Sequence, residues 1–263
     1  MKNLKKLGLM GGVALLLVVV GGSALATTDP GGAVIIPRVF NDSFASVLTT
    51  TNNYPSVIDI NDVAAGPLGW ANLHVWRMSD DATTPFEFAN TDGFRLAADL
   101  TITGDGKAEA GLQISPWWSP LVDGRFNVRT TDGEVACFGG RLPFYSFGTG
   151  QYTMGQTVRV EIIYRPNTEM NEAMPATIEY IYGGTSSGQI PFDEGNPAEA
   201  DPHGTWGILT PATAGGHFQF FDMANDGEGT SMTVTWANIV FEDLGSVVPA
   251  EEESWSGVKA LFR

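Results

Sequence analysis

Two adjacent tryptophans, Trp117 and Trp118, are the clearest candidates in this sequence for contact with a ligand. They follow a strand-like segment and are flanked by prolines, which predicts a loop tip. Adjacent residues of an extended chain point to opposite faces, so we expect one ring inside and Trp118 exposed. Flat rings stack on sugars, and polar side chains bind the hydroxyl groups. The sequence therefore predicts a glycan-binding site, whose members are Trp117, Trp118, Tyr145, Gln113 and Arg129.

Acidic residues around glycines suggest a second kind of chemistry. The segment DMANDGEGTS, residues 222–231, carries several oxygen ligands of the kind that Ca²⁺ prefers. The candidate ligands are Asp222, Asn225, Asp226 and Glu228. Asp42 and Asp243 would form another such pair if the first and last strands lie side by side. Both groups are also compatible with acids that simply form turns, and the sequence favours that reading.

Catalytic motifs are missing. There is no phosphate-binding loop or dinucleotide fingerprint, and the three histidines share no metal-ligand spacing. The segment around His217 is compatible with a strand that exposes its imidazole. Isolated strand acids are interpreted as solvated faces, and Cys137 as a small core residue; the acids are Asp99, Glu109, Glu161 and Glu179. The sequence therefore favours a protein without catalytic activity.

The first 26 residues predict secretion. Three lysines precede an apolar run, and Ala24 and Ala26 form an A-x-A cleavage site. Cleavage there removes three lysines and no acid, which takes the formal net charge from -16 to -19. Such acidity argues against nucleic acid as a partner, because phosphate binding needs clustered Lys and Arg. We expect a secreted or cell-surface protein with no membrane span in its mature chain.

The elements that must position these residues are β-strands. Apolar and polar residues alternate in segments rich in Val, Ile, Thr and aromatic residues, with turn residues between them. Asp-Gly pairs mark two hairpins. The predicted strands are 93–104, 108–115, 124–140, 156–166, 176–184 and 230–244. Many short strands in one chain predict an all-β fold, an antiparallel two-sheet sandwich whose first and last strands are adjacent.

Composition divides the chain into five parts. A signal peptide (1–26) and an N-terminal lead (27–37) precede one β-sandwich domain at 38–244. An acidic linker (245–253) and a short tail (254–263) follow. The tail has helical spacing of its apolar residues, and it is either a sorting or docking segment with its own partner or a helix that packs on the sandwich.

The order of the predicted strands and their residue types resemble the concanavalin A-like lectin/glucanase jelly roll. This family includes legume lectins, laminin G-like modules, glucanases and alginate lyases. RVFNDSF is similar to its opening strand and VTWANIVFED to its closing strand. The resemblance implies a sheet face on which sugars bind, and often calcium. The lyases of this fold carry Q-I-H, where this chain has Gln113, Ile114 and Ser115; the glucanases carry a spaced set of acids that is missing here.

These observations favour a secreted, non-catalytic, lectin-like protein that binds a glycan or polysaccharide, with calcium as the one cofactor considered. Two alternatives stay open. One is a polysaccharide-active enzyme of the same fold, either a lyase or a glycoside hydrolase. The other is a structural or adhesive surface protein that binds another protein.

Overall fold

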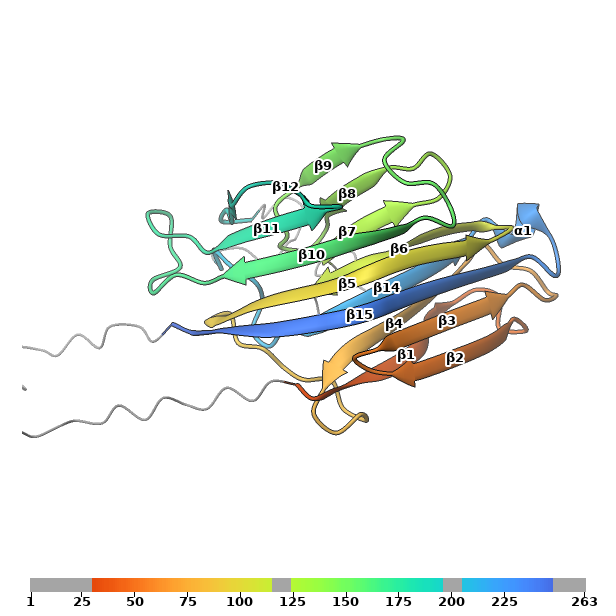
Figure 1. Ribbon diagram of the computed structural model, residues 1–263, viewed down its shortest axis with the longest axis horizontal. Helices are drawn as coiled ribbons and strands as arrows, with labels where there is room; N and C mark the ends of the chain where they lie inside the picture. The colour runs from red at the N-terminus through yellow and green to blue at the C-terminus, as the bar shows by residue number, and fades with distance from the viewer. Residues whose placement is uncertain (1–29, 115–123, 196–204, 248–263) are drawn as a thin grey trace, which may run out of the picture.

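The computed structural model is a sandwich of two antiparallel sheets, which confirms the predicted fold class (Figure 1). It describes residues 30–114, 124–195 and 205–247. One sheet has seven strands, in the order β1 (Gly32–Asn41), β4 (Ala71–Ser79), β14 (Ala214–Phe221), β6 (Lys107–Ile114), β7 (Gly124–Arg129), β8 (Val135–Phe138) and β9 (Tyr145–Gly148).

The second sheet has eight strands. In order they are β12 (Thr185–Ser186), β11 (Thr177–Tyr182), β10 (Thr157–Arg165), β5 (Asp92–Gly104), β15 (Ser231–Ser246), β3 (Val57–Val63) and β2 (Val47–Asn53), while β13 (Ile190–Pro191) pairs with β11. A one-turn helix, α1 (Met223–Asp226), links β14 to β15. Within the described ranges no helix is long and apolar enough to cross a membrane.

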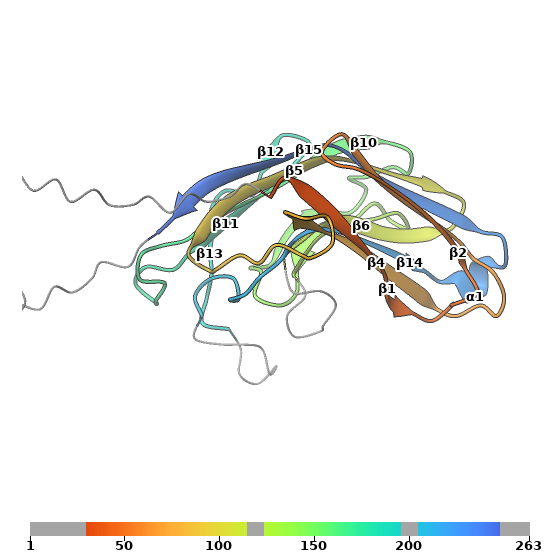
Figure 2. The same ribbon diagram turned by 90° about the horizontal axis from the view of Figure 1, so that it is seen from below.

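The hydrophobic core lies between the two layers, which Figure 2 shows one above the other. Strands such as β3 alternate strictly, with Ile58 and Ile60 fully buried and their neighbours turned outward. In β4, by contrast, all nine residues are buried. Alternation is therefore visible in the sequence of β3 and invisible in β4, because one face of β3 and neither face of β4 meets water.

Two tryptophans join the layers at the centre. Trp76 on β4 and Trp236 on β15 meet edge to face, with ring centroids 6.1 Å apart. The indole N–H of Trp236 donates to the carbonyl oxygen of Gly111 in the opposite sheet, at 3.0 Å. A side chain at Gly216 would collide with both indoles. Glycine at this position is therefore what allows the two rings to share one layer of the core.

The expected pairing of the first and last strands is wrong. β1 pairs with β4 at the edge of the seven-stranded sheet, whereas β15 lies inside the other sheet. Both hydrogen-bonding edges of β15 are taken, by β3 and β5. Asp42 and Asp243 consequently lie on different sheets and do not form the expected pair of cation ligands: Asp42 accepts from the Trp70 N–H and Asp243 from the Gly245 N–H.

The core predictions for single residues hold in part. Cys137 is buried, and burial raises the pKa of its thiol well above the usual value. Trp76 and Trp236 are core residues. Trp70 is 54% exposed, because it lies just before β4 begins. Trp206 is half-buried.

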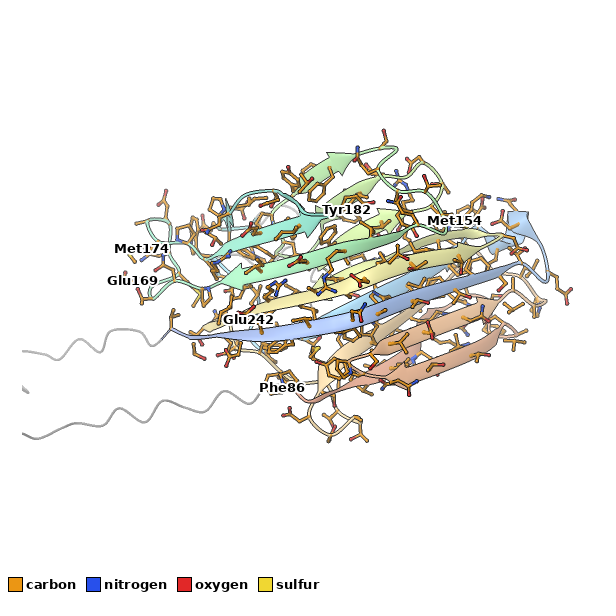
Figure 3. The ribbon with its side chains drawn as sticks, in the orientation of Figure 1. Phe86, Met154, Glu169, Met174, Tyr182 and Glu242 are labelled. Atoms are coloured by element: carbon orange, nitrogen blue, oxygen red, sulfur yellow. The ribbon has the colours of Figure 1, made fainter. Side chains whose placement is uncertain are left out.

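The outer face of the eight-stranded sheet is a paired ionic surface. Arg95 lies 2.7 Å from Glu161 and 3.4 Å from Glu242, which is labelled in Figure 3. Further pairs join Arg159 to Asp99 and Arg165 to Glu179. Three of the four acids that we expected on a solvated strand face lie on this surface: Asp99, Glu161 and Glu179. The fourth, Glu109, belongs to the other sheet.

Candidate functional site

Polar side chains gather on the outer face of the seven-stranded sheet, the face turned away from the core. In β6, β7 and β14 the inward positions are apolar, such as Leu112, Phe126 and Phe218. The positions between them carry side chains that can bind charges or protons. We call these the outer-face cluster: Arg77, Glu109, Gln113, Arg125, Asn127, Arg129, His217 and Gln219.

The strand register brings these residues into neighbouring rows. In one row, His217 is opposite Gly111, and Gly111 is opposite Asn127 on the next strand. In the row beside it, Gly215 lies opposite Arg77 on one side and Gln113 on the other. Gln113 in turn is opposite Arg125. Residues opposite one another in an antiparallel pair share a face, so four strands contribute to one cluster.

Two glycines leave room within the cluster. A Cβ at Gly111 would collide with the carbonyl oxygen of Phe126, and one at Gly215 with the carbonyl oxygen of Trp76. The same Cβ at Gly111 would lie 3.4 Å from Cε1 of His217. The imidazole therefore lies over a backbone position without a side chain, between polar groups of β4, β6 and β7.

His217 is the central titratable group. It is fully buried, and its Nε2 lies 3.0 Å from Oδ1 of Asn127. Its Nδ1 has no hydrogen-bond partner among the described residues. Burial, followed by the positive charges of Arg125 and Arg77, lowers the pKa of His217 well below the usual value, although the nearby Leu112 carbonyl opposes this. The ring is therefore neutral at neutral pH and can accept a proton.

Glu109 and the arginines complete the charge pattern. Burial raises the pKa of Glu109, against the opposing effects of Arg125, Arg129 and a hydrogen bond from Asn127. Arg125 donates to Oε1 of Gln219 at 2.9 Å. The cluster reaches solvent at its border, where the side chains of Glu109 and Arg129 are 19% and 30% exposed.

This arrangement has a definite chemical capacity. Guanidinium groups bind carboxylates, and carboxamides bind carboxylates or hydroxyl groups. A neutral imidazole beside them can remove a proton that the bound carboxylate has made acidic. The cluster thus combines an anion-binding part with a candidate base.

The predicted glycan-site residues fall in different places. Gln113 and Arg129 belong to the outer-face cluster. Tyr145, on β9, packs against the core, and its ring centroid lies 4.9 Å from that of Phe147 in an edge-to-face arrangement. Its neighbour Phe144 is 72% exposed. Trp117 and Trp118 lie outside the described residues, so their roles stay predictions.

Two of the four predicted calcium ligands pair with a lysine. The ammonium group of Lys107 pairs with the carboxylates of Asp222 and Asp226, and Asn225 donates to Asp222. Glu228 is exposed. Among the residues that the structure describes, no group of three or more acids, histidines or cysteines could hold a metal ion. A calcium ion at this loop stays a prediction, and it would have to compete with Lys107.

Sequence reasoning missed most of the outer-face cluster. The imidazole of His217, for which the sequence left exposure on a strand open, is fully buried, and Glu109 is more buried than a solvated strand face would be. Arg77, Asn127 and Gln219 were not singled out. The signal that the sequence offers is that β6, β7 and β14 each place polar residues at alternate positions. This alternation does not reveal which strands are neighbours in the sheet.

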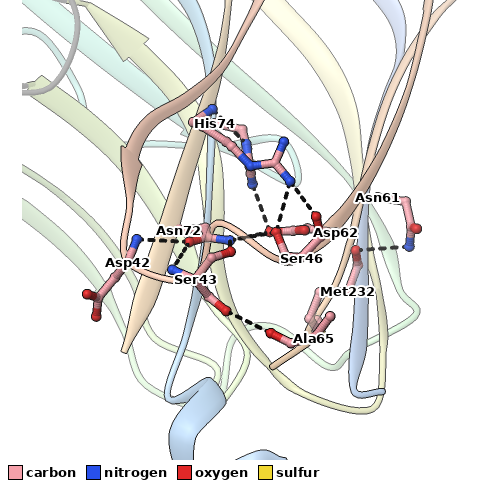
Figure 4. Close-up of polar contacts among 10 residues, drawn as sticks. Asp42, Ser43, Ser46, Asn61, Asp62, Ala65, Asn72, His74 and Met232 are labelled. Atoms are coloured by element: carbon pink, nitrogen blue, oxygen red, sulfur yellow. Dashed lines mark hydrogen bonds and ion pairs between the residues drawn. The ribbon is translucent and has the colours of Figure 1, made fainter. Parts of the chain in front are cut away.

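A second buried histidine lies between the two sheets (Figure 4). Nε2 of His74 is 3.1 Å from Oδ2 of Asp62, and its Nδ1 accepts from the backbone N–H of Arg38 at 3.0 Å. Asn72 also donates to the same carboxylate oxygen, at 2.8 Å. These residues, with Ser43 and Ser46, form what we call the interior cluster. Both ring nitrogens of His74 are satisfied, so this cluster joins β1, β3, β4 and the loop after β1, and it offers no open acceptor on the ring.

Comparison with known proteins identifies the fold. No protein-family profile and no curated sequence matches this chain. Alginate lyase A1-II', a member of polysaccharide lyase family 7, aligns with a TM-score of 0.50 at 10% identity, over 84% of this chain and 97% of that one. This likeness shows a concanavalin A-like jelly roll, as the strand pattern predicted.

Two further alginate lyases align at lower scores. AlgAT5, from polysaccharide lyase family 7, has a TM-score of 0.45 at 9% identity, over 82% of this chain and 95% of that one. The enzyme from Corynebacterium sp. has a TM-score of 0.43 at 11% identity, with the same two coverages.

Proposed function

We propose that this protein binds an acidic polysaccharide at the outer-face cluster and cleaves it by β-elimination. The observation that carries the proposal is a neutral, buried imidazole, His217, between the guanidinium groups of Arg77 and Arg125 on one sheet face. The jelly-roll fold shared with an alginate lyase supports the same reading over that of a lectin without catalysis. The substrate class is a polyuronate, of which alginate is one.

The reaction needs a proton acceptor and a way to stabilise negative charge. Arg77, Arg125 and the carboxamide of Gln113 hold the uronate carboxylate, which makes the proton on the adjacent carbon more acidic. Nδ1 of His217 takes that proton. The electrons of the C–H bond form the new C=C bond, and the C–O bond to the next sugar breaks. The imidazolium then returns its proton to the departing oxygen, which leaves an unsaturated uronate and a new chain end.

In this proposal, His217 takes the place of the histidine that is missing from the Q-I-H motif. In the sequence, Gln113 and Ile114 are followed by Ser115, where the lyase motif has histidine. In this chain the imidazole comes from β14, the strand paired with β6, and it lies on the same face as Gln113. The chemistry that the motif supplies from one strand would therefore come from two. Secretion, which the N-terminal segment predicts, would bring the protein to such polymers.

The test is incubation of the purified protein with polymannuronate, polyguluronate and polygalacturonate, with a neutral glucan as control. Product formation is followed by the ultraviolet absorbance of the new C=C bond. We expect absorbance to rise with at least one polyuronate and to stay flat with the glucan and with the His217→Gln variant. Binding without product would favour the lectin-like alternative, and neither binding nor product would contradict the proposed function.

A further inference from the structure

The outer-face cluster contains a chain of three side chains that the proposed reaction does not by itself require. Oδ1 of Asn127 lies 3.0 Å from Nε2 of His217. The carboxamide of Asn127 also lies near the carboxylate of Glu109, close enough to oppose the rise in its pKa. Asn127 is buried and is opposite Gly111 on β6, so it bridges the imidazole and the acid across the strand between them. The three groups form a continuous path from solvent-facing charge to the buried ring.

Glu109 determines which way the carboxamide points. An ionised carboxylate only accepts hydrogen bonds, so it must face the NH₂ group of Asn127. That leaves Oδ1 toward His217. Oδ1 also only accepts, so Nε2 of the imidazole must carry the hydrogen, and the lone pair lies on Nδ1.

Arginines hold Glu109 in place. Arg129 lies 3.9 Å from its carboxylate and is itself bound, at 2.6 Å each, by Asp132 and Glu134. The charge of Arg125 also favours the ionised form of Glu109. The acid is therefore held beside guanidinium groups whose charges favour its ionised form against the effect of burial.

We propose that Asn127 and Glu109 are positioning residues that hold His217 in the Nε2–H form and leave Nδ1 free to accept a proton. Their meaning for catalysis rests on the function proposed above, whereas the tautomer is a property of the resting protein. Neither residue touches the substrate in this proposal; both act through the ring.

The tautomer can be measured directly by ¹⁵N NMR of the histidine side chains in the full-length protein. The chain has three histidines, and the His217 signals are those lost in the His217→Gln variant. In the unmodified protein we expect the proton on Nε2. In Asn127→Leu, which removes the acceptor at nearly constant volume, we expect a mixture of tautomers. In Asn127→Asp, which keeps an acceptor, we expect Nε2–H to persist.

Glu109→Gln tests the other end of the chain without altering Asn127. An amide can accept or donate, so it no longer dictates the orientation of Asn127, and Nδ1–H should gain population. If the competent tautomer falls to about a tenth, kcat falls roughly tenfold while KM stays within about twofold. Asp59→Asn, the same kind of change on the outer face of the other sheet, should alter neither the spectrum nor kcat.

The outcomes separate this inference from the proposed function. A proton on Nδ1 in the unmodified protein, or an unchanged tautomer in both Asn127→Leu and Glu109→Gln, would overturn the positioning role whatever the activity. If Asn127→Leu does not fold, Glu109→Gln decides alone. The expected tautomer in a protein that cleaves no polyuronate would leave the positioning role standing and remove the proposed function.

Discussion

His74 and His217 occupy paired strands of the same sheet and point in opposite directions. His74 is opposite Phe218, and the next residue along, Val75, is opposite His217. Because side chains alternate, this offset of one residue places one ring between the sheets and the other on the outer face. Both rings are fully buried.

Their surroundings differ in sign and in completeness. His74 faces the carboxylate of Asp62 and has a partner for each nitrogen, whereas His217 faces two guanidinium groups and keeps Nδ1 without a described partner. A polar group in a sandwich core must satisfy itself within the protein, since nothing else enters there. Burial alone therefore does not mark a functional histidine. A ring nitrogen without a hydrogen-bond partner, close to positively charged side chains, does.

The largest expected effect is on activity. His217→Gln removes the base, which should reduce kcat on the best polyuronate by about 100- to 10,000-fold. The free energy of unfolding, measured in urea, should change by less than about 1 kcal/mol, since the ring has few partners to lose. A variant destabilised as strongly as one in the interior cluster would erase the distinction between the two histidines.

The next effect is on stability. Asp62→Ala leaves His74 and Asn72 without their shared acceptor between the sheets, and breaking such a buried pair costs about 3–5 kcal/mol. Asp59→Ala, on the same strand but facing outward, is the control and should cost less than about 1 kcal/mol. Urea unfolding of both variants gives the comparison, and equal losses would show that the interior cluster contributes nothing special.

The two buried carboxylates should respond to pH with opposite signs. Burial opposes ionisation of Asp62, but hydrogen bonds from His74 and Asn72 prevail and lower its pKa, so its stabilisation is present above the unfolded-state value and is lost as pH falls through the folded-state pKa. Burial raises the pKa of Glu109, so its stabilisation is present below the unfolded-state value and is lost as pH rises through the folded-state pKa.

That difference can be measured as the change in unfolding free energy that each substitution causes across acid pH. Asp62→Asn should lose its destabilising effect as pH falls from about 7 to about 3, because the wild-type advantage disappears. Glu109→Gln should change in the opposite direction over the same range. Parallel curves for the two variants would mean that the two carboxylates share one kind of environment.

The smallest expected effect is on a single hydrogen bond of the outer-face cluster. Gln219→Met removes the acceptor of Arg125 at similar volume and should cost about 1 kcal/mol or less, since Gln219 is half-buried. The interior counterpart is Asn72→Leu, which leaves the buried Ser43 N–H without its acceptor and removes one of the donors to the Asp62 carboxylate, so it should cost clearly more. Thermal unfolding ranks the two, and a reversed order would contradict the comparison.

The fold was more predictable than the site, for a physical reason. Strands with one wet face, such as β5 and β15, announce themselves by alternation, and their predicted ranges differ from the observed ones by a residue or two. Strand β4 is buried at every position, and β14 is buried at nearly every position and alternates only at His217 and Gln219. These are the strands that carry Arg77 and His217. The site was hidden because two of the strands that build it carry little of the alternation by which strands are found.

Neighbourhood in the sheet was the second obstacle. Gln113 and Arg125 are close in sequence, and a β-hairpin formed by their two strands would place them side by side. His217 reaches the same place from more than a hundred residues away, through a pairing of β14 with β6 that no local pattern specifies. Long-range pairing is decided by the whole set of packed faces, which a single sequence does not display.

Strand β15 has a consequence for how the chain is made. It is the last strand that the structure describes, and it separates β3 from β5 in the middle of the eight-stranded sheet. During synthesis both of those strands exist with an open edge until residues 231–246 emerge, so the nascent chain cannot complete its core early. A chain cut short before β15 would leave two unpaired strand edges and would leave the Trp76 indole without Trp236, which favours aggregation over partial folding. Completion of the eight-stranded sheet therefore waits for residues 231–246.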